Sequence, residues 1–205
     1  MAAETGESRW QVSYHEQMLE EPGRREPAPQ PLRLVQAFVN TRDIENGVEE
    51  LATPEALRDA LLRIGVLEAG EPALGESDLR HALEVREALR ELLLANNGGQ
   101  VGPLALATLE RAARSVHVGI RFSAESADLV AEARGVDGAL GRILAVIPLA
   151  VADGTWARLK ACPRDVCHWV FYDRSRNHSS TWCSMSVCGN RTKTRRYRAR
   201  RAYAA

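Results

Sequence analysis

The sequence predicts a mainly α fold with a small β component, in which a helical N-terminal domain precedes a small module of different chemistry. Three observations predict it. Apolar residues recur at helical spacing through much of residues 32–154. All four cysteines of the 205-residue chain lie between Cys162 and Cys188. Residues 156–205 hold 12 basic and 2 acidic side chains, whereas residues 1–155 hold 15 basic and 25 acidic ones, so a net charge of zero hides two unlike parts.

The first elements follow from local start and stop signals. Residues 1–31 are polar and end in a proline-rich stretch, which predicts a tail with a stiff linker. The apolar run from Leu32 to Asn40 predicts the first helix. Thr53 is a typical N-cap ahead of a proline and an acid, so a second helix is expected from there to Ile64, where Gly65 ends it.

The rest of the body predicts three more helical regions and one hairpin. Ser77 is the expected cap of a long helix that ends at Asn97-Gly98-Gly99. Loose alternation predicts a β-hairpin between 116–122 and 129–133. The remaining segments with a helical pattern are 103–114, 141–153 and 155–161.

One charged residue lies within an apolar helical stripe. Arg86 is near the centre of the stripe that runs from Leu79 to Leu93. A buried arginine needs an acidic partner or an anionic ligand. Arg86 is therefore expected either to snorkel or form an ion pair, with Asp43 as the candidate partner, or to line a ligand pocket in the helical body.

The cysteines form two close pairs. Four residues separate Cys162 from Cys167 and Cys183 from Cys188, and fifteen residues lie between the pairs. Four thiolates in this arrangement suit tetrahedral zinc, and in a cytosolic protein paired cysteines more often bind metal than form disulfides. A closed four-thiolate site has no open position for a substrate, so we expect one structural zinc ion. Disulfides, free thiols and an iron–sulfur cluster are the alternatives.

The residues around the cysteines predict a treble-clef-like module with a β-hairpin and a basic helix. Residues 168–172 are β-rich, 173–177 are turn-like and 181–182 begin the expected return strand. A helix is expected after Cys188, and Cys183 or Cys188 must lie on the turn before it, because the two would be about 140° apart on one helix. Three aromatic side chains are expected to cover the metal: Trp169, Phe171 and Trp182.

The last helix carries cations on nearly every side, which suits contacts with phosphates. DNA is therefore the expected partner. Asn190 is expected to contact a base or to cap the helix, and a solvated helix that balances the acidic body is the alternative. The expected nucleic-acid contacts are Asn190, Arg191, Lys193, Arg195, Arg196, Arg198, Arg200 and Arg201.

Several motifs resemble a known family. The segments 153–156, 158–162, 171–177 and 188–191 (the last reading Cys-Gly-Asn-Arg) resemble the CGNR zinc-finger family. Upstream, Phe-Val-Asn-Thr, Leu-Ala-Thr-Pro and Arg-Glu-Ala-Leu-Arg resemble the ABATE domain that usually precedes this finger. The resemblance implies an ABATE-like helical domain over 32–154, a CGNR-type finger over 155–205, and a bacterial stress-induced transcription regulator.

Two functions are consistent with these features. The first is a zinc-containing DNA-binding regulator whose helical body senses a signal or forms a homodimer. The second is a protein- or RNA-interaction adaptor. An enzyme is not expected, because no nucleophile has a neighbouring base and no phosphate-binding glycine loop is present. No apolar run reaches the roughly 18 residues of a membrane span, and no signal peptide is apparent, so a cytoplasmic protein without a membrane partner is expected.

The opposite charges of the two parts suggest one further hypothesis. The acidic body, with a balance of −10 over residues 1–155, would mask the basic helix until something separates them. Removing residues 1–150 would then strengthen DNA binding.

Overall fold

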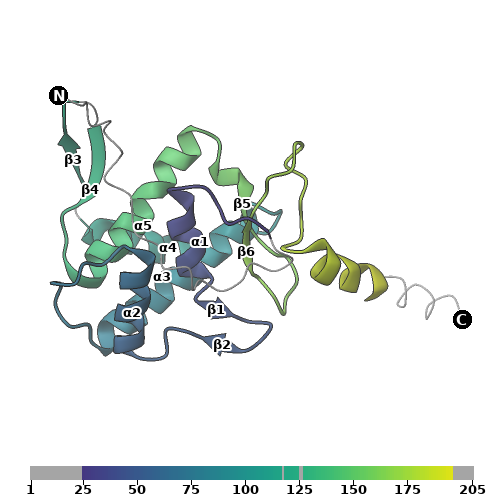
Figure 1. Ribbon diagram of the computed structural model, residues 1–205, viewed down its shortest axis with the longest axis horizontal. Helices are drawn as coiled ribbons and strands as arrows, with labels where there is room; N and C mark the ends of the chain where they lie inside the picture. The colour runs from purple at the N-terminus through teal and green to yellow at the C-terminus, as the bar shows by residue number, and fades with distance from the viewer. Residues whose placement is uncertain (1–24, 117, 125–126, 196–205) are drawn as a thin grey trace, which may run out of the picture.

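The computed structural model describes residues 25–116, 118–124 and 127–195, which form a mainly α fold with three small sheets (Figure 1). Each sheet is an antiparallel pair: β1 with β2, β3 with β4, and β5 with β6. The predicted fold class is confirmed. In chain order the elements are α1 (Leu32–Val39), β1 (Arg42–Asp43), β2 (Val48–Glu49), α2 (Pro54–Ile64), α3 (Glu76–Ala95), α4 (Pro103–Ser115), β3 (Val118–Phe122), β4 (Ala127–Ala131), α5 (Gly135–Ala152), β5 (Leu159–Ala161) and β6 (Val170–Tyr172).

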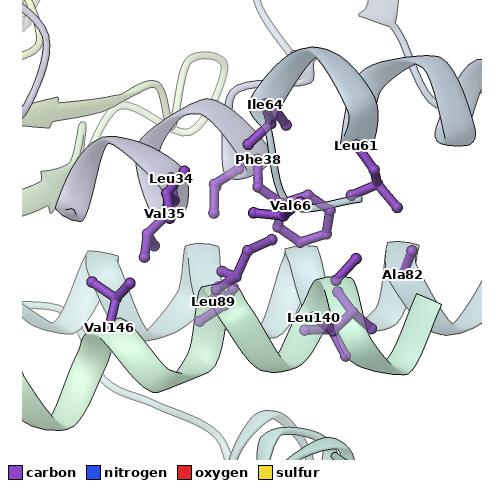
Figure 2. Packing of buried hydrophobic residues seen from close by; sticks show 14 of the residues in the cluster. Leu34, Val35, Phe38, Leu61, Ile64, Val66, Ala82, Leu89, Leu140 and Val146 are labelled. Carbon is purple, nitrogen blue, oxygen red and sulfur yellow. The ribbon is translucent and has the colours of Figure 1, made fainter. Parts of the chain in front are cut away.

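The main core lies between α1, α2, α3 and α5. Figure 2 shows Phe38 of α1 among side chains from the other three helices, including Leu61 of α2, Leu89 of α3 and Leu140 of α5. All four side chains are fully buried. Burying side chains of this size stabilises the fold by about 1.5–3 kcal/mol each. The same core continues into β5 and β6 through Leu159, Val170 and Tyr172, among others.

Local signals set the bounds of α1, α2 and α4 as predicted. The Thr53 hydroxyl accepts a hydrogen bond from the Ala56 amide at 3.2 Å, and Gly65 ends α2 with a positive φ of 84°. The cap of α3 differs from the prediction. Gly75 is the N-cap, and Asp78 accepts its amide hydrogen at 2.8 Å, so Ser77 lies inside the first turn.

Helix α5 begins six residues before the predicted start. Its glycines weaken the sequence pattern, but packing requires two of them: a Cβ on Gly141 would lie 2.0 Å from the Val116 side chain, and one on Gly138 would lie 2.1 Å from the Ala133 carbonyl oxygen. By length and composition alone α5 could cross a membrane, as core helices often could. Here Leu140 and Ile143 are fully buried in the main core, so α5 is a core helix of this fold.

Two predictions for the C-terminal part are wrong. Residues 155–161 are not a helix, because a single 3-10 turn over Trp156–Arg158 leads directly into β5. The β-rich run after Cys167 becomes β6, but it pairs with β5 rather than with 181–182. Burial of all three β5 residues overrides their helical pattern. The hairpin thus encloses the first cysteine pair instead of joining the two pairs.

The C-terminal module lies at one end of the molecule, and the β3–β4 hairpin lies at the other (Figure 1). The β3–β4 hairpin confirms the hairpin predicted from the sequence, but its second strand begins at residue 127 instead of 129. Part of the predicted tail packs on the module: the Arg25 guanidinium stacks 4.8 Å from the Phe171 ring centroid and donates to the Trp182 carbonyl at 2.9 Å. Residues 25–31 are therefore an ordered strap in this structure.

Candidate metal centre and basic helix

The four cysteines converge on one point. Their Sγ atoms all lie within 4.8 Å of one another, and all four side chains are buried. Cys183 Sγ lies 3.6 Å from Cys167 Sγ and 3.5 Å from Cys188 Sγ. Four sulfurs bound to one zinc ion at about 2.3 Å would be separated by about 3.8 Å, so the cluster has the size of a tetrahedral zinc site.

The electrostatics of the cluster favour a bound cation. Hydrogen bonds from Cys167 and Cys183 lower the pKa of the Cys162 thiol far below its usual value. The pKa of Cys183 is raised, first by its hydrogen bond with Cys162 and then by that with Cys167. One thiolate is thus favoured while its neighbours resist ionisation. A divalent cation offsets the repulsion among four thiolates, and that is what a structural zinc ion supplies.

Two backbone turns carry the ligands. Cys162 and Cys167 lie at the ends of the loop between β5 and β6, where the Cys162 amide donates to the Trp169 carbonyl at 3.0 Å. Cys183 precedes a π-helical turn over Met185–Gly189, and Cys188 lies within that turn. The prediction that at least one of these two cysteines lies before the helix is confirmed. Ser184 caps the turn by accepting the Val187 amide at 3.3 Å.

The residues around the cluster form a second, smaller core. The predicted aromatic side chains Trp169, Phe171 and Trp182 pack with the cysteines. Gly189 is buried beside them, and a Cβ at this position would lie 3.2 Å from the Trp182 ring and 2.5 Å from Met185 Sδ. The close approach of this turn to Trp182 therefore accounts for the glycine of the Cys-Gly-Asn-Arg motif.

The basic helix starts where the metal site ends. Residues 190–195 are helical, and Thr192 and Thr194 donate to the Cys188 and Asn190 carbonyls at 2.9 and 3.0 Å. Asn190 is exposed and its side chain reaches back to the Ser186 carbonyl at 3.5 Å. A shallow hollow on this helix is lined by Asn190, Arg191, Thr194 and Arg195. The predicted contacts Arg196, Arg198, Arg200 and Arg201 lie outside the described residues.

Family comparisons agree with this architecture. Residues 158–201 match the CGNR zinc finger, and residues 32–161 match the ABATE family, whose description is "Putative stress-induced transcription regulator". The chain belongs to the ABATE family. Together with the cysteine cluster, the two matches confirm the resemblance found in the sequence and the expected single zinc ion. Neither match is an enzyme family, and no curated protein matches the chain.

In the ABATE domain, Arg86 is buried and forms an ion pair, but its partner is not Asp43. Its guanidinium donates to both Glu49 oxygens at 2.6 and 2.7 Å and to Glu87 at 2.9 Å. Asp43 instead accepts from Asn46, which shapes the β1–β2 turn. Burial opposes the charge on Glu49, yet the hydrogen bond from Arg86 lowers its pKa overall. Carboxylates thus satisfy Arg86 in the way the ion-pair interpretation expects.

Polar side chains of the ABATE domain hold the finger in place. Arg90, which is buried, donates to the His168 carbonyl of the finger at 3.1 Å and to the Val39 carbonyl at 2.7 Å. Asn97 donates to the Ala161 and Thr181 carbonyls at 2.8 and 2.7 Å. The backbone carbonyls of the finger therefore help to fix it to the body, in addition to the side chains of Leu159, Val170 and Tyr172 that lie in the main core.

One further contact joins the domain to the metal site. Arg164, between the first two cysteines, donates to Glu45 at 2.8 Å and to Cys188 Sγ at 3.7 Å. The hydrogen bond with Glu45 raises the pKa of Arg164. Glu45 also pairs with Arg191 of the basic helix. The place of Arg164 in the cysteine loop could have marked it in the sequence, but nothing local marks Glu45, which lies 146 residues from Arg191.

Proposed function

We propose that this chain is a zinc-containing DNA-binding protein that acts in the bacterial cytoplasm as a transcription regulator. The observation that carries the proposal is the basic helix at the metal site. Arg191, Lys193 and Arg195 follow directly on the ligand Cys188, within a 50-residue segment that holds only two acids.

The physical argument is electrostatic. Four thiolates and one zinc ion leave about −2 on the site, so the segment of residues 156–205 keeps about +8. The closed metal site holds the start of the helix in one position, which reduces the entropy lost on binding. Arginines on such a helix can donate to phosphates or to guanine.

For the remainder of the chain we propose the division expected from the sequence. Residues 1–31 precede an ABATE domain over 32–154, which senses a signal or forms a homodimer, and the finger occupies 155–205. Leu104 on α4 and Phe122 on β3 are 78% and 77% exposed, and a protein-binding role of the domain predicts that a partner covers them.

A mobility-shift titration tests DNA binding directly. The full chain, loaded with zinc, is titrated into a random-sequence duplex at salt concentrations from about 50 to 200 mM. We expect binding that weakens steeply with salt, and we expect Arg195→Ala to reduce the salt slope by about 1. Arg80→Ala removes the same charge from an exposed position at the start of α3 and should leave binding unchanged. Absence of binding at the lowest salt would contradict the proposal.

An adaptor that binds a protein or RNA is the second candidate. It is supported by two apolar side chains of the finger that face solvent, Val166 and Met185, which are 50% and 47% exposed. Capture of a protein partner that survives nuclease treatment, or binding of RNA, would favour it over a DNA-binding regulator when the chain does not bind duplex DNA.

A further inference from the structure

The β1–β2 hairpin of the ABATE domain carries a carboxylate to the zinc finger. Figure 1 shows this hairpin extending toward the C-terminal module. Its base is fixed by Glu49, whose two oxygens bind the buried Arg86, and its turn by hydrogen bonds between Asp43 and Asn46. Glu45 lies in that turn, so an ordered segment holds its side chain in place.

A single oxygen of Glu45 contacts two arginines of the finger. Oε1 accepts from Arg164 Nη1 at 2.8 Å and from Arg191 Nη1. The side chains of Glu45 and Arg164 are only 26% and 24% exposed, so this pair is largely screened from solvent, whereas Arg191 is 58% exposed. An anionic oxygen between two guanidinium groups is also how arginines bind a phosphate oxygen.

The two arginines are arranged to hold an anion of either kind. Arg164 is oriented by its second hydrogen bond, to the ligand atom Cys188 Sγ at 3.7 Å. Among the described residues, both of its side-chain contacts run through Nη1, and a guanidinium has five N–H donors. Arg191 opens onto the shallow hollow that it lines with Asn190, Thr194 and Arg195. Arg164 therefore has N–H donors available for a further anion, and Arg191 is accessible from the hollow.

We propose that Arg164 and Arg191 form a phosphodiester-binding site for duplex DNA, and that Glu45 is the anion that occupies this site in the free protein. The inference rests on the proposed DNA binding and goes further, since it adds Arg164 to the interface and makes one ABATE carboxylate a competitor of the DNA backbone. DNA must displace Glu45 before both arginines can contact phosphate. The sequence suggested that the acidic body as a whole masks the basic helix, and this proposal assigns that masking to Glu45.

The test compares Glu45→Gln with Glu68→Gln in the zinc-loaded full chain. Both variants remove one negative charge from the ABATE domain, but Glu68 is 81% exposed and pairs with Arg142 of the same domain at 3.8 Å. We expect Glu45→Gln to bind a random-sequence duplex roughly fivefold more tightly, the equivalent of a partly exposed ion pair, and with a salt slope steeper by about 1. Glu68→Gln should match the wild type.

A double-mutant cycle separates competition from a change in overall charge. Arg191→Ala should weaken DNA binding less than about twofold in the wild-type background, where Glu45 already neutralises the arginine, and about fivefold in the Glu45→Gln background. Equal effects in both backgrounds would overturn the proposal.

Zinc content and thermal midpoint are measured on the same samples. A Glu45→Gln variant that loses zinc would show that Glu45 supports the metal site, which also overturns the proposal, whereas a small decrease of the thermal midpoint with zinc retained is expected from the lost ion pair. If the wild type binds DNA and Glu45→Gln binds no more tightly, this inference fails while the proposed function stands. If neither binds at low salt, the proposed function itself fails.

Discussion

Cys183 lies 3.5 and 3.6 Å from two other cysteine sulfurs, so replacing it removes one corner of the tetrahedron. We expect Cys183→Ser to release zinc and unfold the finger, because structural zinc contributes on the order of 10 kcal/mol to domains of this kind. Metal analysis of the purified variant, with tryptophan fluorescence as the readout of folding, measures the effect.

The matched control for this substitution is Met185→Leu, two residues away at the exposed start of the turn that follows Cys183. It should keep one zinc ion per chain. Retention of zinc by Cys183→Ser would mean that three thiolates are sufficient.

The buried Arg86 depends on Glu49 for most of its charge compensation. Glu49→Ala leaves the guanidinium, which is 1% exposed, with Glu87 as its carboxylate partner. Because Glu49 itself is partly exposed, we expect a loss of about 2 kcal/mol, below the 3–5 kcal/mol typical of fully buried pairs. The free energy of unfolding in urea measures this. Asp43→Ala removes the partner suggested by the sequence and should cost less than about 1 kcal/mol.

At the scale of elements, the loop after β6 is built around a buried ion pair. Lys160 donates to Asp173 at 2.8 Å, and Asp173 also accepts the Ser175 and Ser180 amides, both at 2.9 Å. Burial opposes ionisation of Asp173, but the hydrogen bond from Lys160 and those from the two serines hold the pKa of this carboxyl below its usual value. One carboxylate thus fixes both ends of the loop.

This pair gives a pH prediction. Because the Asp173 pKa is lower in the folded than in the unfolded chain, its stabilisation is complete above the unfolded value of about 3.9 and is lost as the pH falls through the folded value. Asp173→Asn should therefore be less stable at pH 7 by about 3 kcal/mol and lose less stability on acidification.

Urea titrations of both proteins between about pH 7 and pH 3 measure the difference. Asp165→Asn, which removes an exposed acid of the finger, is the control. Parallel pH curves for the wild type and Asp173→Asn would contradict the prediction.

The helices and strands differ in how far the sequence alone predicts them. Helix α2 was predictable because its determinants, Thr53, Pro54 and Gly65, are local. Strand β5 was not, because its conformation depends on pairing with β6, eleven residues beyond, and on burial in the main core. That Arg86 needs a carboxylate was predictable. Its partner Glu49 was not, since β1 and β2 have two residues each, too few to show a period.

For the molecule as a whole, the finger and the ABATE domain have separate cores but share a hairpin. The cysteines pack with Trp169, Phe171 and Trp182, while Leu159 and Val170 of the same hairpin belong to the main core. Deleting residues 1–150 would leave β5 and β6 without the helices that bury them. Single substitutions at Glu45 are therefore a better test of masking than that truncation.

Two cores predict a stepwise response to metal removal. Zinc chelation should unfold the cluster around Trp169 and Trp182, while the helical core around Phe38 stays folded because that core contains none of the four cysteines. Tryptophan fluorescence should shift to the red, and most of the far-ultraviolet ellipticity should remain. A red shift accompanied by loss of the far-ultraviolet ellipticity would mean that the chain unfolds as one cooperative unit.

The side chain of Asn40 has a consequence for association between chains. Its amide donates to the Val170 carbonyl at 2.9 Å and accepts the Val170 amide hydrogen at 2.8 Å, so it imitates the neighbouring strand that β6 lacks. An unpaired strand edge is a template for another chain, and here two side chains of the α1 segment occupy it, since Gln36 also donates to the Val170 carbonyl at 3.2 Å. We therefore expect Asn40 and Gln36 to protect the two-stranded ribbon that encloses the first cysteine pair from pairing with the strand of another chain.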